Sequence, residues 1–490
     1  MKRLTRPTIL ALAIIALGFG LRLFRLDAQS FWYDEAYSAS VASGTPAQII
    51  FNYFNDVHPP LYYLVLHLWQ MIDDSDFTLR LLSAMLGTAG IAALYALGKA
   101  TFDQKVGLAA AAITCLAPYT VFYGQEARMY SLLLLLSSML LLSYNRMLDT
   151  GSTRWWLAYT ACATLSLYVQ YISALLLLGL HLHFFVTHRR DRRPWVLLAT
   201  GDILALLTVA PQLAIFVAAT QRVSDYQWPA PQRPGIASLL SAPYALTLSQ
   251  FTTERLVPLA FAVVLLLLMI THLQLARHMV RAGDKGGKLT LLLCALWTPL
   301  LTAFALSQWQ SIYRERALIV MVPALYLLLS WGATRTKERY FNLVALLLLG
   351  AFAVGGLHNW YFDHGFSKPP FRFAAHSLPD FVEHDEPILH TSDAAFLLFM
   401  RYAPQYEHYL IAGDPTPHMP IETYRLFGGE IVDRNEVTAS QLCLVVALEH
   451  SIEFQREVQD WFDQHFVLVD ARNFDGVILR LYESDGPQAD

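Results

Sequence analysis

The chain has 490 residues, of which 55% are hydrophobic and only 15% are charged. That composition is too apolar for a soluble protein of this length, and we expect no nucleic-acid partner. The formal net charge of −4 conceals an uneven distribution, because the residues from His358 onward contain 22 acidic and 8 basic side chains, whereas the preceding part carries a net +10. The two parts are therefore expected to occupy different surroundings.

Apolar windows that are nearly free of charge recur along the first 357 residues, and they have the length that a helix needs to cross a bilayer. We predict eleven spans, at about 8–26, 79–99, 106–122, 128–146, 155–170, 172–187, 195–217, 256–276, 289–307, 316–332 and 340–357. Three basic residues precede the first window, and no small-residue cleavage site follows it, so we expect this window to be retained as a span. Three of the four cysteines lie in apolar spans, so the sequence predicts neither a disulfide framework nor a cysteine metal site.

Basic residues predict the orientation of these spans, because Lys and Arg are enriched in cytoplasmic loops. Of the 27 basic residues before His358, 18 fall on the side of the predicted spans that also holds the N-terminus. The HRRDRRP loop at 188–194 is the densest of these clusters. We therefore predict that the N-terminus is cytoplasmic and that the acidic C-terminal part lies outside.

The segment HPPLYYLVLHLWQMIDD, which begins at His58, is apolar over too short a run to span a bilayer. If it crossed, the HRRDRRP loop would face outward, against the distribution of the other cations. We predict instead an interfacial helix that Pro59 and Pro60 begin, with tyrosine and tryptophan side chains at the headgroup level.

Residues 358–490 are predicted to form a separate extracytoplasmic domain, and residues 1–357 a membrane domain with an outer loop at 27–78. The apolar runs PILHT, CLVVAL, FVLVD and VILRLY have the character of strands. They alternate with the helix-like runs FRFAAHSLPDFVEH and SIEFQREVQDWFDQH. This alternation predicts an α/β fold.

Polar residues that are unusual in so apolar a chain gather on the predicted outer side. The motif FWYDEAYS, residues 31–38, places Asp34 and Glu35 among aromatic rings, and a carboxylate that aromatic rings partly desolvate is a stronger base. The same two residues also fit an exposed acidic pair in an interfacial loop. YGQEARMYS, residues 123–131, and SIYRERA, residues 311–317, fall on the same side.

Each of these charged residues also has an ordinary structural explanation. Glu126 and Arg128 can pair with each other at the start of a helix. Arg316 and its neighbour Arg314 can be anchors that extend to the interface. His58 before two prolines is typical of a turn.

Considered together, carboxylates and arginines at one membrane surface suit sugar transfer from a lipid-linked phosphate. The lipid tail stays in the bilayer, and its phosphate emerges where arginines can hold it with charge-assisted hydrogen bonds. The leaving phosphate needs cationic stabilisation more than a protonating acid. One carboxylate base for the acceptor hydroxyl is then sufficient.

Five motifs in this order resemble the bacterial GT-C glycosyltransferases: FWYDEAYS, HPPLYYLVLHLW, FTLRLLSA, YGQEARMYSLLLLL and YRERALIVMVPALYLLL. In particular they resemble the family 39 or RgtA/B/C/D-like branch, whose relatives include the protein O-mannosyltransferases and the lipid A aminoarabinose transferase. The resemblance covers roughly residues 8 to 400. It implies a GT-C fold in a bacterial inner membrane, with the active site facing the periplasm or exterior.

The resemblance also implies the chemistry. It makes Asp34 the catalytic carboxylate with Glu35 beside it, and it implies a polyprenyl-phosphate-linked sugar donor and inversion at the anomeric carbon. The acceptor can be a glycan, a lipid or a protein, and some relatives bind a divalent metal near the acidic motif whereas others do not. We expect the donor phosphate or sugar to be bound by Gln125, Glu126, Arg128, Tyr130, Arg314, Arg316 and His58.

Two other classes of function remain as alternatives. A transporter or flippase for a lipid-linked saccharide would usually place ionisable or Gly/Pro-broken positions near the middle of the membrane, whereas the predicted span interiors here are mostly free of charge. A membrane anchor for the outer domain would not need eleven spans.

The predicted orientation can be tested with a reporter that is active only in the cytoplasm, fused after Asp490. We expect no reporter signal, because the cation distribution places the C-terminus outside. A strong signal would overturn both the orientation and the common outer position of the polar motifs.

Overall fold

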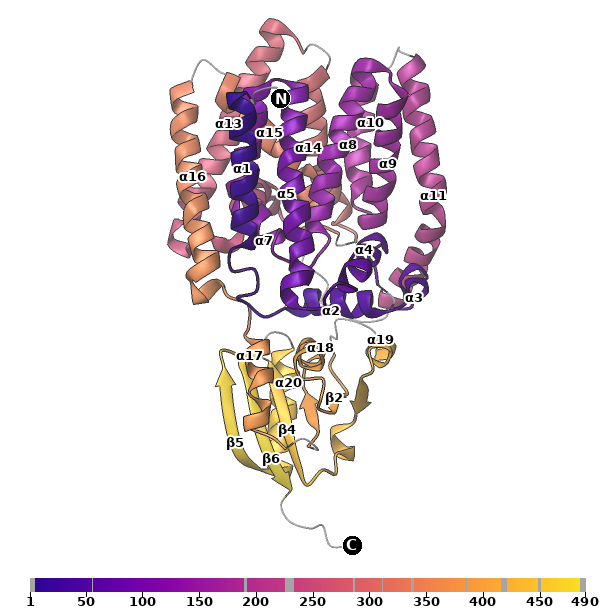
Figure 1. Cartoon of the computed structure of the whole chain (residues 1–490), viewed down its shortest axis with the longest axis vertical. Helices are drawn as coiled ribbons and strands as arrows, with labels where there is room; N and C mark the ends of the chain where they lie inside the picture. The colour runs from indigo at the N-terminus through magenta and orange to yellow at the C-terminus, as the bar shows by residue number, and fades with distance from the viewer. Residues whose placement is uncertain are drawn as a thin grey trace.

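The computed structural model describes residues 5–484 except 55, 189–191, 225–232, 285–286, 311, 336–338, 384–385, 416–420 and 448–450. A bundle of long helices comes first along the chain, and a smaller domain built on a sheet follows it (Figure 1). Part of the basic loop at 188–194 lies outside the described residues, as does the residue used for the reporter fusion.

Among the described residues, eight helices of the bundle are long and apolar enough to cross a membrane, by length and composition. The helices that correspond to the predicted spans are α1 (Arg6–Leu23), α5 (Asp76–Thr101), α6 (Gln104–Leu116), α8 (Tyr130–Thr150), α9 (Thr153–Val169), α10 (Ser173–His188), α11 (Arg192–Ser224), α13 (Val257–Ala282), α14 (Lys288–Leu306), α15 (Val322–Arg335) and α16 (Arg339–Phe362). Of these, α6 and α10 are shorter apolar helices. The number of spans and their orientation stay predictions.

The third predicted span is divided into two helices. Helix α6 ends at Leu116, and α7 (Pro118–Tyr123) begins after one extended residue, Ala117. The proline explains the break, because it disfavours helical backbone at the residue before it and cannot donate a hydrogen bond to the preceding turn. This break lets the chain turn toward the loop at 124–129.

The short helices α2 (Tyr33–Ser43), α3 (Pro46–Ile50) and α4 (Leu61–Gln70) lie at the end of the bundle nearest the sheet domain (Figure 1). Helix α4 has 10 residues and begins directly after Pro60. Helix α1 begins at the opposite end of the bundle (Figure 1).

In the described part of the sheet domain, six strands lie in the order β3-β2-β1-β4-β6-β5. The strands β3, β2, β1 and β4 run parallel to one another, whereas β6 is antiparallel to both β4 and β5. The strands are β1 (Ile388–His390), β2 (His408–Ile411), β3 (Glu430–Val432), β4 (Gln441–Ala447), β5 (Phe466–Phe474) and β6 (Val477–Ser484), and the helices are α17 (Phe371–His376), α18 (Asp393–Tyr402), α19 (Ile421–Leu426) and α20 (Ile452–His465). The α/β character that the sequence predicts is confirmed.

The sheet domain contacts the bundle through the C-terminal end of α18. Arg401 forms an ion pair of 3.0 Å with Asp76 at the start of α5, and Tyr402 donates its hydroxyl hydrogen to the same carboxylate. The hydroxyl of Tyr402 also accepts the backbone N–H of Phe31 at 2.7 Å. The segment just before Asp34 is therefore held by both domains.

Candidate active site

The centre of the site is a buried ion pair between Glu35 on α2 and Arg80 on α5. Arg80 donates from Nε and Nη2 to the two carboxylate oxygens at 2.8 and 2.7 Å, and both side chains are almost completely buried. The guanidinium also donates to three backbone carbonyls of the loop before α2, those of Leu26, Gln29 and Ser30. This one arginine thus fixes the loop and the start of α2 together.

Glu35 has further partners from distant parts of the chain. Lys368 donates from Nζ to its Oε2 at 2.7 Å, and the backbone N–H of Ala127 donates to Oε1 at 3.0 Å. Burial raises the pKa of Glu35, but the charges of Arg80 and Lys368 outweigh it and lower that pKa to about 2. Glu35 is therefore a carboxylate that is charged at neutral pH and fully engaged by its partners.

The neighbouring residue Asp34 faces two arginines. Arg316, from the segment before α15, has its Nη1 2.6 Å from Oδ2 of Asp34, and Arg128 has its Nε 3.9 Å from the same oxygen. The side chain of Asp34 is 15% exposed, compared with 0% for Glu35. The acidic motif thus divides into one residue that solvent reaches and one that is sealed.

Arg128 is buried and helps to hold α2. Its Nη1 donates to the hydroxyl of Ser38 at 2.8 Å and to the carbonyl of Asp34 at 3.3 Å. Burial lowers the pKa of Arg128, but the nearby Asp34 carboxylate raises it well above the usual value, so the guanidinium stays charged. Arg316 differs because its side chain is 35% exposed.

Glu126 lies between these groups and is completely buried. The nearest cation is Lys368, with Nζ 3.1 Å from Oε1, yet neither carboxylate oxygen has a hydrogen-bond partner among the described residues. Burial raises the pKa of Glu126 to about 7, Lys368 opposes this shift, and the charge of Glu35 adds to it. The pairing of Glu126 with Arg128 that the sequence allows is replaced by two separate pairs, Glu126 with Lys368 and Arg128 with Asp34.

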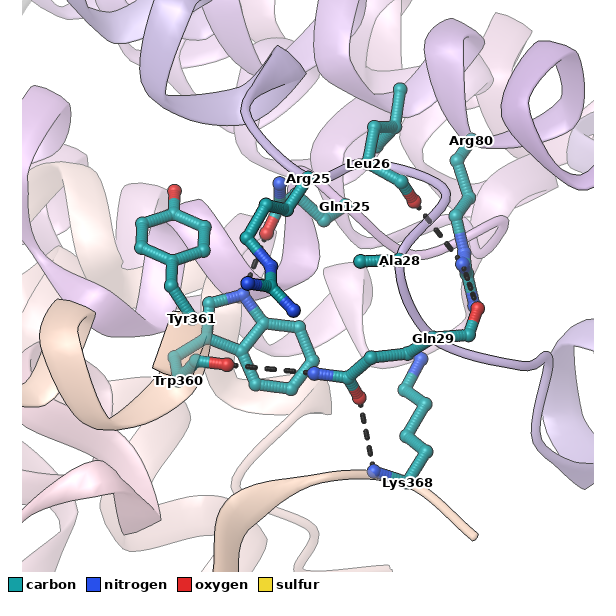
Figure 2. A pocket seen from close by; sticks show the side chains of 9 residues that line it. All are labelled: Arg25, Leu26, Ala28, Gln29, Arg80, Gln125, Trp360, Tyr361 and Lys368. Carbon is teal, nitrogen blue, oxygen red and sulfur yellow. Dashed lines mark hydrogen bonds between the residues drawn. The ribbon is translucent and has the colours of Figure 1, made fainter. Parts of the chain in front are cut away.

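Gln125 has partners within the protein for both ends of its amide. Its Nε2 donates to the carbonyls of Arg22 and Phe24, and its Oε1 accepts the indole N–H of Trp360 at 2.6 Å. Figure 2 shows this contact with Trp360 beside Gln29, which bridges Trp360 and the backbone of Lys368. These contacts give Gln125 a structural role in joining α1 to α16, and Gln29 extends the connection to the segment after α16.

The other predicted ligands are spread around this centre. Tyr130 is buried at the start of α8, with its ring 4.6 Å from that of Tyr123. His58 is paired with Asp56, with Nδ1 2.8 Å from Oδ1. Arg314 lies at the surface next to Arg316.

A cavity of about 760 Å³ opens beside the arginines. Its wall combines charged and aromatic side chains, which include Trp32, Tyr123, Glu126, Tyr313, Arg314, Arg316, Trp360 and Lys368. In volume it is large enough for a small-molecule ligand. It brings together Glu126, Arg314 and Arg316 of the predicted ligand set.

The described residues contain no group of three or more His, Cys, Asp or Glu side chains placed to hold a metal ion. The resemblance leaves open whether a divalent metal takes part. The described residues offer no candidate set of ligands for one.

Sequence reasoning missed two cations of the site, Arg80 and Lys368. Arg80 carried a signal, because it is a charge within the motif FTLRLLSA near the beginning of a long apolar helix, and such charges are usually functional or paired. Lys368 carried none, since nothing in the local sequence distinguishes it from the other seven basic residues after His358.

Comparison with known proteins agrees with this architecture. Residues 57–215 match the family model of the dolichyl-phosphate-mannose-protein mannosyltransferases. ArnT from Cupriavidus metallidurans in the apo state aligns over 96% of this chain and 97% of its own, at 13% identity and a TM-score of 0.64. The same protein bound to undecaprenyl phosphate aligns over 97% and 99%, at 14% identity and a TM-score of 0.60.

A more distant structure has a similar fold. The Archaeoglobus fulgidus oligosaccharyltransferase tethered with an acceptor peptide aligns over 97% of this chain and 74% of its own, at 11% identity and a TM-score of 0.52. No sequence among the curated proteins matches the chain. The chain is a multi-pass membrane protein with the GT-C fold, and the resemblance to the GT-C glycosyltransferases that its motifs carry is confirmed.

The burial of Glu126 predicts a specific dependence of stability on pH. The pKa rises from the ordinary 4.5 to about 7 on folding, so the folded protein binds this proton more tightly. Stability should therefore fall as pH rises from about 4.5 to about 7, and the penalty should persist above that range. We expect Glu126→Gln to raise the midpoint of thermal unfolding at pH 8, by about 2–4 °C, and by less at pH 5.

Glu254→Gln is the matched control, because Glu254 is an exposed glutamate on the first turn of a short helix. It should leave the midpoint unchanged at both pH values. A Glu126→Gln protein that is less stable than the wild type at pH 8 would mean that the charge pair with Lys368 stabilises the fold.

Proposed function

We propose that this protein is an integral-membrane glycosyltransferase. It moves a sugar from a polyprenyl-phosphate-linked donor to a hydroxyl acceptor at the extracytoplasmic face of a bacterial inner membrane. The observation that carries the proposal is the contact between a partly exposed carboxylate, Asp34, and a partly exposed arginine, Arg316, that lines a cavity of about 760 Å³. In this proposal residues 1–357 form the catalytic domain, and residues 358–490 form an extracytoplasmic domain.

In the proposed reaction Asp34 is the general base. Its carboxylate takes the proton of the acceptor hydroxyl while the acceptor oxygen forms a bond to the anomeric carbon. The bond from that carbon to the phosphate oxygen breaks, and the polyprenyl phosphate leaves with the electron pair. A single displacement of this kind inverts the anomeric centre.

Arg316 is the proposed ligand of the donor phosphate. A guanidinium can hold phosphate oxygens through two hydrogen bonds, and its positive charge stabilises the negative charge that grows as the phosphate leaves. The charge of Asp34 raises the pKa of Arg316, which keeps it cationic. Arg314 adds positive charge to the wall of the cavity. Arg128 instead pairs with Asp34 and keeps α2 in place.

Glu35 is proposed to position the base without taking part in proton transfer. It is sealed from solvent and its two oxygens are occupied by Arg80, Lys368 and the backbone of Ala127. Its low pKa also makes it a poor proton acceptor.

The function can be tested with purified protein and a panel of undecaprenyl-phosphate-linked sugars. We expect one member of the panel to be consumed, with release of undecaprenyl phosphate and glycosylation of a cell-envelope acceptor. A transporter or flippase would move the lipid without breaking the glycosidic bond. Intact donors throughout the panel would contradict the proposal.

Replacing Asp34 by Asn keeps the shape of the side chain and removes its basicity. Turnover should fall by about 10² to 10⁴-fold, because general base catalysis contributes that much. Binding of undecaprenyl phosphate, measured by titration, should be kept. Asp27→Asn is the control in the same loop, since its side chain is 48% exposed and pairs only at the surface, and near-normal turnover is expected. An active Asp34→Asn protein would move the base elsewhere.

Replacing Arg316 by Lys keeps the charge but removes the planar pair of donors. Affinity for undecaprenyl phosphate and turnover should both fall, by about tenfold or more, because the phosphate charge exists before transfer and grows during it. Arg335→Lys, which alters an exposed ion pair with Asp103, should change neither. If Arg316→Lys lowered turnover and left lipid-phosphate affinity intact, Arg316 would act on Asp34 alone.

A further inference from the structure

Two buried polar groups on the wall of the 760 Å³ cavity have no hydrogen-bond partner among the described residues. One is the carboxylate of Glu126, an acceptor at both oxygens. The other is the indole N–H of Trp32, a donor. Buried polar groups are nearly always hydrogen-bonded, so an acceptor and a donor left unpaired on one cavity wall point to a ligand that would pair them.

The lack of partners at Glu126 is costly. Lys368 supplies charge at 3.1 Å but no hydrogen bond of good geometry, and its ammonium already donates to Glu35. A buried carboxylate with unfilled acceptor sites destabilises the folded chain. A glutamine of the same shape would avoid the cost of a buried charge but would still leave polar atoms unpaired, so packing alone does not explain a polar side chain here.

The two groups lie next to the proposed reaction centre. Trp32 is two residues before Asp34, and its ring is 6.0 Å from the guanidinium carbon of Arg316. Glu126 is two residues before Arg128, and the charge of Asp34 acts on its ionisation. During transfer the sugar must lie between the base and the phosphate, and Trp32 and Glu126 line the same space.

The chemistry of the pair fits a neutral, hydroxyl-rich ligand. A carboxylate accepts hydrogen bonds from hydroxyl groups, an indole N–H donates to hydroxyl or ring oxygens, and the aromatic rings on the wall offer apolar faces. An ionised phosphate has no hydrogen for the carboxylate of Glu126 to accept, whereas the arginines can donate to its oxygens, which assigns the phosphate to the arginines and the neutral part of the donor to this wall.

We propose that Glu126 and Trp32 form the subsite that recognises hydroxyl groups of the transferred sugar. This inference rests on the proposed function and adds to it the residues that select the sugar. A site built to bond a hydroxyl discriminates strongly against an analogue that lacks it, because its own polar groups are then left unpaired. The two residues should therefore act on the sugar and leave lipid-phosphate binding unaffected.

The test compares the affinity of the protein for undecaprenyl phosphate with its affinity for undecaprenyl phosphates carrying glucose, galactose, mannose or arabinose. The sugar-linked lipid that binds most tightly to the wild type is taken as the reference. The ratio of its affinity to that of bare undecaprenyl phosphate measures the contribution of the sugar to binding. We expect Glu126→Gln and Trp32→Phe each to lower affinity for that sugar-linked lipid by about tenfold, which corresponds to one hydrogen bond. Affinity for bare undecaprenyl phosphate should stay within about twofold of the wild type.

A monodeoxy form of the preferred sugar sharpens the test. The form that lacks the hydroxyl bound by Glu126 should bind the wild type as weakly as the complete sugar binds Glu126→Gln, and the variant should not distinguish the two. Trp309→Phe is the control for the ring substitution, since Trp309 is 82% exposed, and Glu254→Gln is the control for the carboxylate. Both controls should bind every ligand as the wild type does.

Several outcomes would overturn the inference. Equal losses for bare and sugar-linked lipid would show that the two residues only support the fold, and unchanged affinities would show that they touch no sugar. The inference also fails if the wild type binds undecaprenyl phosphate but no sugar-linked form more tightly. A wild type that binds none of these lipids would instead contradict the proposed function, and the inference would fall with it.

Discussion

The arrangement of the site depends on the buried ion pair between Glu35 and Arg80. Arg80 is fixed on a long helix of the bundle, and its five donor positions are directed at one carboxylate and at the carbonyls of the loop before α2. Removing one partner of such a pair leaves an uncompensated charge in the interior, which typically costs about 3–5 kcal/mol. The position of Asp34 therefore follows from that of its neighbour Glu35.

Two adjacent residues of the acidic motif consequently have different environments. Glu35 is enclosed by cations, and its pKa is held at about 2. Asp34 is partly exposed beside the arginine that lines the cavity. A third carboxylate, Glu126, shares Lys368 with Glu35 and has a pKa of about 7. Burial by itself raises the pKa of both Glu35 and Glu126. The pKa values of these neighbouring carboxylates differ because their charged partners differ.

The C-terminal part of the chain contributes residues to the site. Lys368, in the segment that leads from α16 to this domain, supplies the cation between two buried carboxylates. Phe31 lies between two guanidinium groups, with Arg80 of the bundle at 4.8 Å and Arg401 of the sheet domain at 4.7 Å from its ring. A shift of the sheet domain would thus move the loop before α2, and with it the start of α2, where Asp34 lies.

The sequence by itself determined the helical membrane bundle, the α/β character of the last part and the outer motifs. These follow from local patterns, namely apolar length, alternation and the residue types of each motif. Even the division of the third span was encoded locally, in Pro118. Strands β2 and β3 were not predicted, because their short runs HYLI and EIV begin with the polar residues His408 and Glu430 and lack an apolar stretch that marks a strand.

Only the tertiary structure decided which charges meet. Arg316 lies 282 positions from Asp34 and Lys368 lies 333 positions from Glu35, so no local pattern could pair them. The sequence offered Glu126 and Arg128 to each other because they are neighbours, whereas folding gave each a partner from another segment. The physical reason is that burial makes an ion pair obligatory without specifying its source, and only the packing of distant segments selects the cation that arrives.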